Sequence, residues 1–151
     1  MSKIKLNDPA AAEACGEVGT VADAPQPMPL AGVLVALCFE VRNQAHVAHL
    51  GAQGDGSYAK HMALDEFYND IIGAADAYAE NWQGRYGLMT IGMHEASIPR
   101  DNVPIEAVIA ALRDWIDQNR AKCGAESELQ NLIDNIQSIC NKAIYKLTYL
   151  H

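Results

Sequence analysis

Residues 58–83 read YAKHMALDEFYNDIIGAADAYAENWQ, and the pattern within them decides the fold. Apolar side chains recur every three or four residues, which is the period of one face of an α-helix. These side chains are Leu64, Phe67, Tyr68, Ile71, Ala75, Tyr78 and Trp82. A glycine-rich turn at residues 51–56 precedes the stretch, Ser57 is a suitable N-cap, and Gly84 and Gly87 follow it. The sequence therefore predicts a long helix over residues 58–83.

Three further segments show the same helical period. They span residues 30–50, 104–122 and 126–149. Short turns join the first helix to the second and the third to the fourth, so each of these pairs is predicted to be antiparallel. The connection over residues 84–103 is long enough to cross the bundle and to place the second and third helices parallel. No segment shows strand-type alternation, and we predict an all-α, ferritin-like four-helix bundle over residues 30–151 with one long crossover.

The first 29 residues differ in composition from the rest of the chain. They are rich in Ala, Gly and Pro and end in Pro25-Gln26-Pro27-Met28-Pro29. Three prolines within five residues are incompatible with the interior of a helix or of a central strand. We predict a flexible arm over residues 1–29. Because its four acidic residues outnumber Lys3 and Lys5, DNA binding through this arm is not expected.

The chain of 151 residues is acidic, with 11 Lys and Arg against 19 Asp and Glu and a formal net charge of −8. This charge argues against a protein whose whole body coats nucleic acid or an anionic membrane. No apolar run reaches the roughly 18 residues that a membrane-spanning helix needs. No CxxC pair is formed by the four cysteines, so we expect reduced thiols in a cytoplasmic protein. They are Cys15, Cys38, Cys123 and Cys140.

One flank of the predicted helix 58–83 carries histidine and carboxylate side chains, which are types that can bind metals. With His61 as the reference and about 100° per residue, Asp65 lies near 40°, Asp76 near 60° and Glu80 near 100°. His49, near the end of the preceding helix, can approach His61 across the glycine-rich turn. A mixed set of imidazole and carboxylate ligands suits iron, and also zinc or manganese. The alternative is that each residue is simply a solvated or structural side chain, which is the usual role of any one of them taken singly.

The length of the helix limits how these residues share an ion. Fifteen residues separate His61 from Asp76, which is about 22 Å at 1.5 Å per residue. One chain therefore cannot bring both halves to the same ion. If they share a site, two chains must pair their second helices antiparallel, so the spacing predicts a dimer with two equivalent sites. Each site would combine one chain's half with the other half from its partner. The halves are His49, His61 and Asp65, and Asp76 and Glu80.

The spacing of the five residues resembles the ferroxidase signature of Dps-type mini-ferritins. In this chain it reads His49-x11-His61-x3-Asp65-x10-Asp76-x3-Glu80. Residues 61–68 are similar to the start of the second helix of these proteins, and residues 76–80 are similar to its end. The ExxH motif of four-helix di-iron carboxylate proteins is absent from the chain. The same segment also resembles small bacteriophage proteins of unassigned function with a predicted ferritin-like fold.

The resemblance implies iron chemistry. Dps-type proteins bind Fe(II) at dimer interfaces, oxidise it with peroxide or oxygen, and store ferric mineral in a hollow shell of twelve subunits. Carried over to this chain, the resemblance makes iron the bound metal and a dodecamer the expected assembly, with Glu80 as a candidate bridging ligand. The same five residues would be the metal-binding and the catalytic residues: His49, His61, Asp65, Asp76 and Glu80.

Some positions depart from the Dps pattern. Members usually have Trp directly after the first His, where this chain has Leu50, and the turn that follows is richer in glycine. These departures leave a second hypothesis: a structural or assembly protein, for instance of a phage particle and then virion-associated, with the fold but little or no ferroxidase activity. His46 is predicted to be a surface residue, as are Met93, His94 and Glu95 in the long connection.

Overall fold

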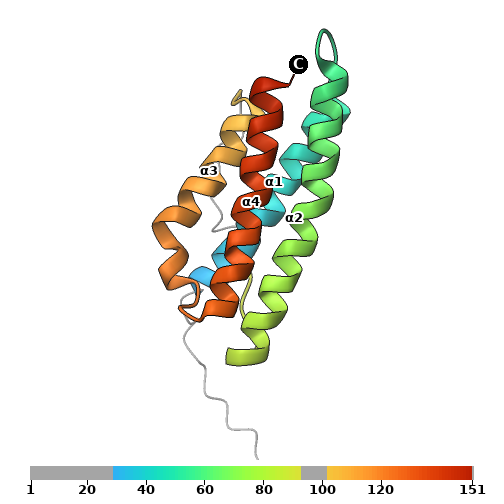
Figure 1. Ribbon diagram of the computed structural model, residues 1–151. Coiled ribbons are helices and arrows are strands. Elements are labelled where there is room, and N and C mark those ends of the chain that lie inside the picture. Colours follow the sequence, from blue (N-terminus) through green and yellow to red (C-terminus); the bar gives the residue numbers. More distant parts are fainter. Residues whose placement is uncertain (1–28, 93–101, 151) are drawn as a thin grey trace, which may run out of the picture.

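The computed structural model describes residues 29–92 and 102–150 of the chain, and these form four α-helices with no strand (Figure 1). The helices are α1 (Leu30–Leu50), α2 (Ser57–Tyr86), α3 (Ile105–Asn119) and α4 (Ser127–Tyr149), with a 3₁₀ turn, η3 (Arg120–Lys122), after α3. The predicted all-α, four-helix architecture is confirmed. The predicted arm, apart from Pro29, lies outside the described residues, as do Met93, His94 and Glu95.

The helix ends differ from the sequence prediction where local signals compete. Ser57 is the first residue of α2 and not its cap; Gly56 precedes it with φ of 73°. Gly84 lies inside α2, which ends at Gly87 with φ of 94°, a left-handed conformation that favours glycine. The third helix ends at Asn119, earlier than expected, because the chain tightens there into the 3₁₀ turn.

Each helix packs mainly against two neighbours, in the cyclic order α1, α2, α4, α3. Contacts fix the directions: Arg85 near the end of α2 pairs with Glu128 at the start of α4, and Lys146 near the end of α4 pairs with Glu66 near the start of α2. Figure 1 shows α2 and α3 running in the same direction. Neighbouring helices are therefore antiparallel, and residues 87–104 connect opposite ends of the bundle.

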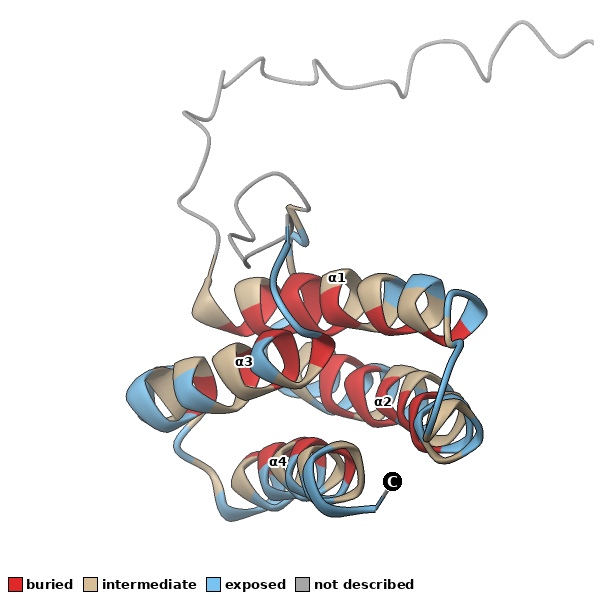
Figure 2. Ribbon diagram, turned by 90° about the horizontal axis from the view of Figure 1, so that it is seen from above, coloured by how far each residue is buried: buried red, intermediate tan, exposed pale blue. Residues whose placement is uncertain are grey.

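The core lies along the axis of the bundle, where the buried faces of the helices meet (Figure 2). Its largest fully buried side chains come from all four helices: Leu34, Leu37, Leu64, Phe67, Ile71, Tyr78, Ile109, Leu112, Ile116, Leu129, Ile133 and Ile136. Cys38, Cys123 and Cys140 are buried free thiols. Burial raises the pKa of Cys123 to about 11 and that of Cys140 to about 12, so both stay protonated.

An ion-pair cluster between α2 and α4 makes the stability of the bundle depend on pH. Glu66 pairs with Lys142 and Lys146, and hydrogen bonds from Lys142 and then Lys146 hold the pKa of Glu66 below its ordinary 4.5. A lowered folded pKa contributes stability that is present above pH 4.5 and is lost as the pH falls through the folded pKa. We expect Glu66→Gln to flatten the acid limb of Tm against pH, measured by circular dichroism between about pH 6 and pH 3. If the wild type and Glu66→Gln lose Tm in parallel over that range, the pH dependence does not come from the Glu66 ion pairs.

Within the described residues, no helix is both long and apolar enough to cross a membrane.

Candidate metal site

Two histidines meet where α1 ends and α2 begins. The rings of His49 and His61 stack with their centroids 3.7 Å apart and their planes 25° from parallel. The turn between the two helices brings them together, and it reverses the chain through Gly54 and Gly56, whose φ angles of 84° and 73° favour glycine. The approach of His49 to His61 that the sequence predicts is therefore confirmed.

Each of these two rings is oriented by the backbone of the other residue. Nδ1 of His49 lies 3.0 Å from the carbonyl oxygen of His61, and Nδ1 of His61 lies 3.2 Å from that of His49. Because a carbonyl oxygen only accepts hydrogen bonds, both Nδ1 atoms carry the proton and donate it. In the neutral tautomer the lone pair is then on Nε2 of both rings. Histidines that bind metals use the same arrangement, in which the outer N–H is held by a carbonyl or carboxylate and the inner nitrogen is free for the ion.

Asp65 lies one turn after His61 and is held by a tyrosine. The hydroxyl of Tyr68 donates to Oδ1 of Asp65 over 2.7 Å. This hydrogen bond raises the pKa of Tyr68, so the phenol stays a donor. The ring of Tyr68 stacks on His46, with centroids 4.2 Å apart, and stands edge-on to His49 at 5.2 Å. Asp65 is thus linked to His49 through Tyr68, and no direct contact with either histidine is part of this arrangement.

The structure corrects one prediction in this cluster and adds one residue to it. His46 is half-buried against Tyr68 and lies 6.0 Å from His49 between ring centroids, so the prediction of a surface residue is wrong. The apolar stripe predicts core packing for Tyr68, and the spacing of Tyr68 from Asp65 is a second signal. Tyr68 lies three residues after Asp65, and residues three apart on a helix are neighbours, so its hydroxyl can reach the carboxylate.

The remaining two candidates lie farther along α2. Asp76 and Glu80 are exposed, and neither has a hydrogen bond or ion pair with the described part of the chain. They are fifteen and nineteen residues beyond His61, which places Asp76 about 22 Å from it along the helix. Within the described residues, no group of three or more His, Cys, Asp or Glu side chains is close enough to hold a metal ion. The structure therefore brings His49 and His61 together, does not group Asp65 with them as an ion site within one chain, and places Asp76 and Glu80 farther along α2.

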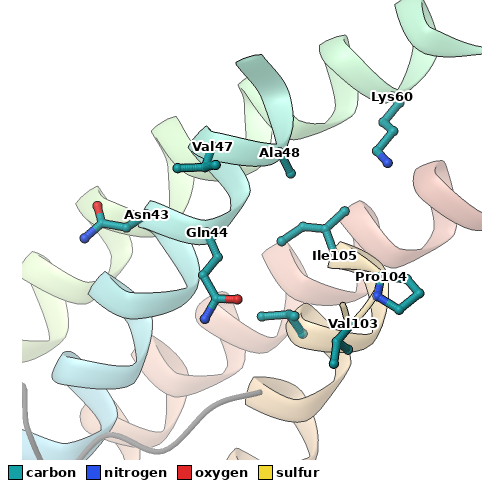
Figure 3. A pocket seen from close by; sticks show the side chains of 9 residues that line it. Asn43, Gln44, Val47, Ala48, Lys60, Val103, Pro104 and Ile105 are labelled. Atoms are coloured by element: carbon teal, nitrogen blue, oxygen red, sulfur yellow. The ribbon is translucent and has the colours of Figure 1, made fainter. Parts of the chain in front are cut away.

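A cavity of about 450 Å³ lies apart from these residues, between the second half of α1 and the start of α3 (Figure 3). Its walls are mainly apolar, and Lys60 is the only charged side chain among the described residues that line it. None of the five candidate ligands contributes to it. The described lining consists of Asn43, Gln44, Val47, Ala48, Lys60, Val103, Pro104, Ile105 and Val108.

Comparison with known families gives a match over residues 49–147, which is more than half of the chain. The chain belongs to the family of unknown function DUF5856. The matched range begins at His49, contains all five candidate ligands, and extends through α2 and α3 into the last turns of α4. No curated protein and no solved structure matches the chain. This family has no assigned activity.

Proposed function

We propose that this chain is a ferritin-like, Dps-type iron-binding protein that oxidises Fe(II) at sites shared by two copies of the chain. The observation that carries the proposal is the reciprocal hydrogen bonding of His49 and His61. Each ring donates Nδ1–H to the other residue's carbonyl oxygen, which frees both Nε2 atoms for an ion. In this proposal a hollow homo-oligomer, a dodecamer by resemblance to Dps-type proteins, stores or detoxifies the iron.

The topology supports the ferritin-like assignment. Ferritin-like bundles place one long crossover between the second and third helices, and in this chain residues 87–104 connect α2 to a parallel α3. Among the described residues, α2 packs mainly against α1 and α4, and these helices leave Asp76 and Glu80 exposed. A second copy can therefore reach these two acids without disturbing the bundle.

The register of the candidate ligands supports a two-fold pairing of α2. Asp65 and Asp76 are equally distant from the point between residues 70 and 71, and so are His61 and Glu80. When two α2 helices lie antiparallel with that point on the two-fold axis, both pairs come level along the helix direction at the same time. The same two-fold rotation brings His49, His61 and Asp65 of one chain towards Asp76 and Glu80 of the other.

The donor set suits iron. Each shared site would offer two imidazole nitrogens and three carboxylates, and this mixture is common to sites for iron, manganese and zinc. Anionic oxygen ligands stabilise Fe(III) more than Fe(II), because the ion of higher charge gains more from them. Iron is here the substrate and the cargo, and the chain's own residues bind and orient it. The acidic net charge of −8 attracts cations to the assembly.

The direct test is oxidation of Fe(II) by the purified full chain with hydrogen peroxide, followed by the absorbance of the ferric product. We expect Asp76→Ala and Glu80→Ala to reduce the rate to about a tenth or less, because each removes an ion ligand. Asp70→Ala is the matched control, since Asp70 is an exposed acid of α2 that lies beside Lys142 of α4 and not on the stripe of the candidate ligands. Wild-type rates equal to those of both variants, or of iron alone, would overturn the proposal.

A second candidate function is assembly, and one observation favours it. Large apolar side chains are exposed where α1 meets α2: Val47 is 72% exposed, Leu50 75% and Tyr58 77%. Large apolar side chains exposed at the end of one helix and the start of the next can contribute to a surface that binds another protein. An assembly protein would keep its oligomeric mass by light scattering after metal is removed with a chelator. A mass that falls on metal removal would instead favour the shared metal site.

A further inference from the structure

Tyr68 contacts both the carboxylate of Asp65 and the imidazole of His49. Its hydroxyl donates to Oδ1 of Asp65, and its ring stands edge-on to His49 at 5.2 Å between centroids. His46 stacks on the ring of Tyr68, with ring centroids 4.2 Å apart. One side chain therefore touches a candidate carboxylate ligand and a candidate imidazole ligand at the same time.

The hydroxyl contact leaves Asp65 able to bind an ion. A carboxylate has two oxygens, and the hydrogen bond from Tyr68 occupies Oδ1. The second oxygen stays available, while the bond restricts rotation of the carboxylate. Carboxylates that ligate metals are commonly held in this way by outer hydrogen-bond donors.

The ring contacts fix Tyr68 itself. His46 stacks on the ring, and the guanidinium carbon of Arg42 lies 5.5 Å from its centroid, which is the range of a cation–π contact. Both residues belong to α1, whereas Tyr68 and Asp65 belong to α2. The contacts therefore fix the ring of Tyr68 against α1. Through the hydroxyl of Tyr68 they also restrict the carboxylate of Asp65.

We propose that Tyr68 is the positioning residue of the metal site, holding the carboxylate of Asp65 through its hydroxyl and packing its ring against His49 without binding the ion itself. The inference rests on the proposed function, because it assigns a role within the same site. This role distinguishes Tyr68 from Tyr78. The side chain of Tyr78 is fully buried, and its hydroxyl donates to the carbonyl oxygen of Cys123. Tyr78 is thus a tyrosine with a purely structural hydrogen bond on the same helix.

The experiment is anaerobic binding of Fe(II) to the full chain, with Co(II) absorption as a second readout of ligand geometry. The variants are Tyr68→Phe, Asp65→Ala, the double variant of these two, and Tyr78→Phe as control. We expect Tyr68→Phe to weaken binding by about 10- to 100-fold, which is the usual effect of losing an outer hydrogen bond to a ligand. In the Asp65→Ala background the same change should have no further effect, because Tyr68 acts through Asp65.

The control separates positioning from stability. Tyr78→Phe should lower Tm and leave both the affinity and the Co(II) spectrum unchanged, whereas Tyr68→Phe should alter both readouts in a chain that remains folded by circular dichroism. Wild-type affinity in Tyr68→Phe, or additive losses in the double variant, would overturn the inference and leave the proposed function standing. Failure of the wild type to bind either metal would overturn the proposed function and this inference together.

Discussion

Two inactive variants of this chain, dissociated, mixed and reassembled, should regain about a quarter of the wild-type rate of Fe(II) oxidation. One variant is His61→Ala, and the other combines Asp76→Ala with Glu80→Ala. Random pairing puts about half of the chains into mixed dimers, and each mixed dimer holds one intact site out of two. The intact site takes its histidines from the acid-deficient chain and its acids from the histidine-deficient chain.

The matched control is a mixture of His61→Ala with His49→Ala. Both changes fall in the same half-set of ligands, so no pairing of these two chains gives an intact site. Rates are measured with peroxide after dissociation and reassembly, with each variant treated alone as the baseline. Recovery in the first mixture but not in the control supports a site shared between chains. Absence of recovery in both mixtures would contradict the sharing, and equal recovery in both would mean that the half-sets were assigned wrongly.

Most of the fold follows from the periodicity of the sequence. The bounds predicted for the first helix, residues 30–50, are those of α1, because Pro29 and Gly51 interrupt the helical pattern on either side. The bounds of α2 could not be read from its glycines, since Gly84 continues the helix and Gly87 ends it. Packing decides between such glycines: Trp82 and Tyr86 bring their rings to 5.0 Å, and Arg85 reaches Glu126 and Glu128 on α4.

The candidate site was predictable in its parts and not in its contacts. The six-residue turn was enough to expect that His49 approaches His61, because so short a connection brings the helix ends together. The angular position of His46 on its own helix did not reveal that the neighbouring helix lies on that side. Tyr68 was assigned to the core for the same reason. Side-chain neighbours across two helices depend on how the helices are rotated, and one helix's periodicity does not contain that information.

The second prediction with a large effect concerns Ile72, which lies nearest the proposed two-fold axis together with Asn69. Ile72 is a half-buried apolar residue on the same stripe of α2 as Asp65 and Asp76. It lines a shallow hollow of about 320 Å³ with Phe39, Arg42 and Asn43. Pairing of two α2 helices in the proposed register would cover this residue in both chains. We expect Ile72→Glu to weaken the dimer by at least about 100-fold, because two carboxylates would be removed from water at the axis.

The free chain should tolerate Ile72→Glu. The position is partly open to solvent in the free chain, and glutamate is a good helix former. The matched control is Val47→Glu, which introduces the same charge at a 72%-exposed apolar residue that lines the cavity on the α3 side of α1. Sedimentation of each variant in metal-replete buffer gives the dissociation constant, and the same samples give the oxidation rate. If Ile72→Glu gives monomers and loses oxidation while Val47→Glu does neither, the result supports a two-fold axis on α2. A dimer that survives Ile72→Glu with full oxidation would contradict the register, since a charge cannot stay unpaired at the centre of an intact interface without cost.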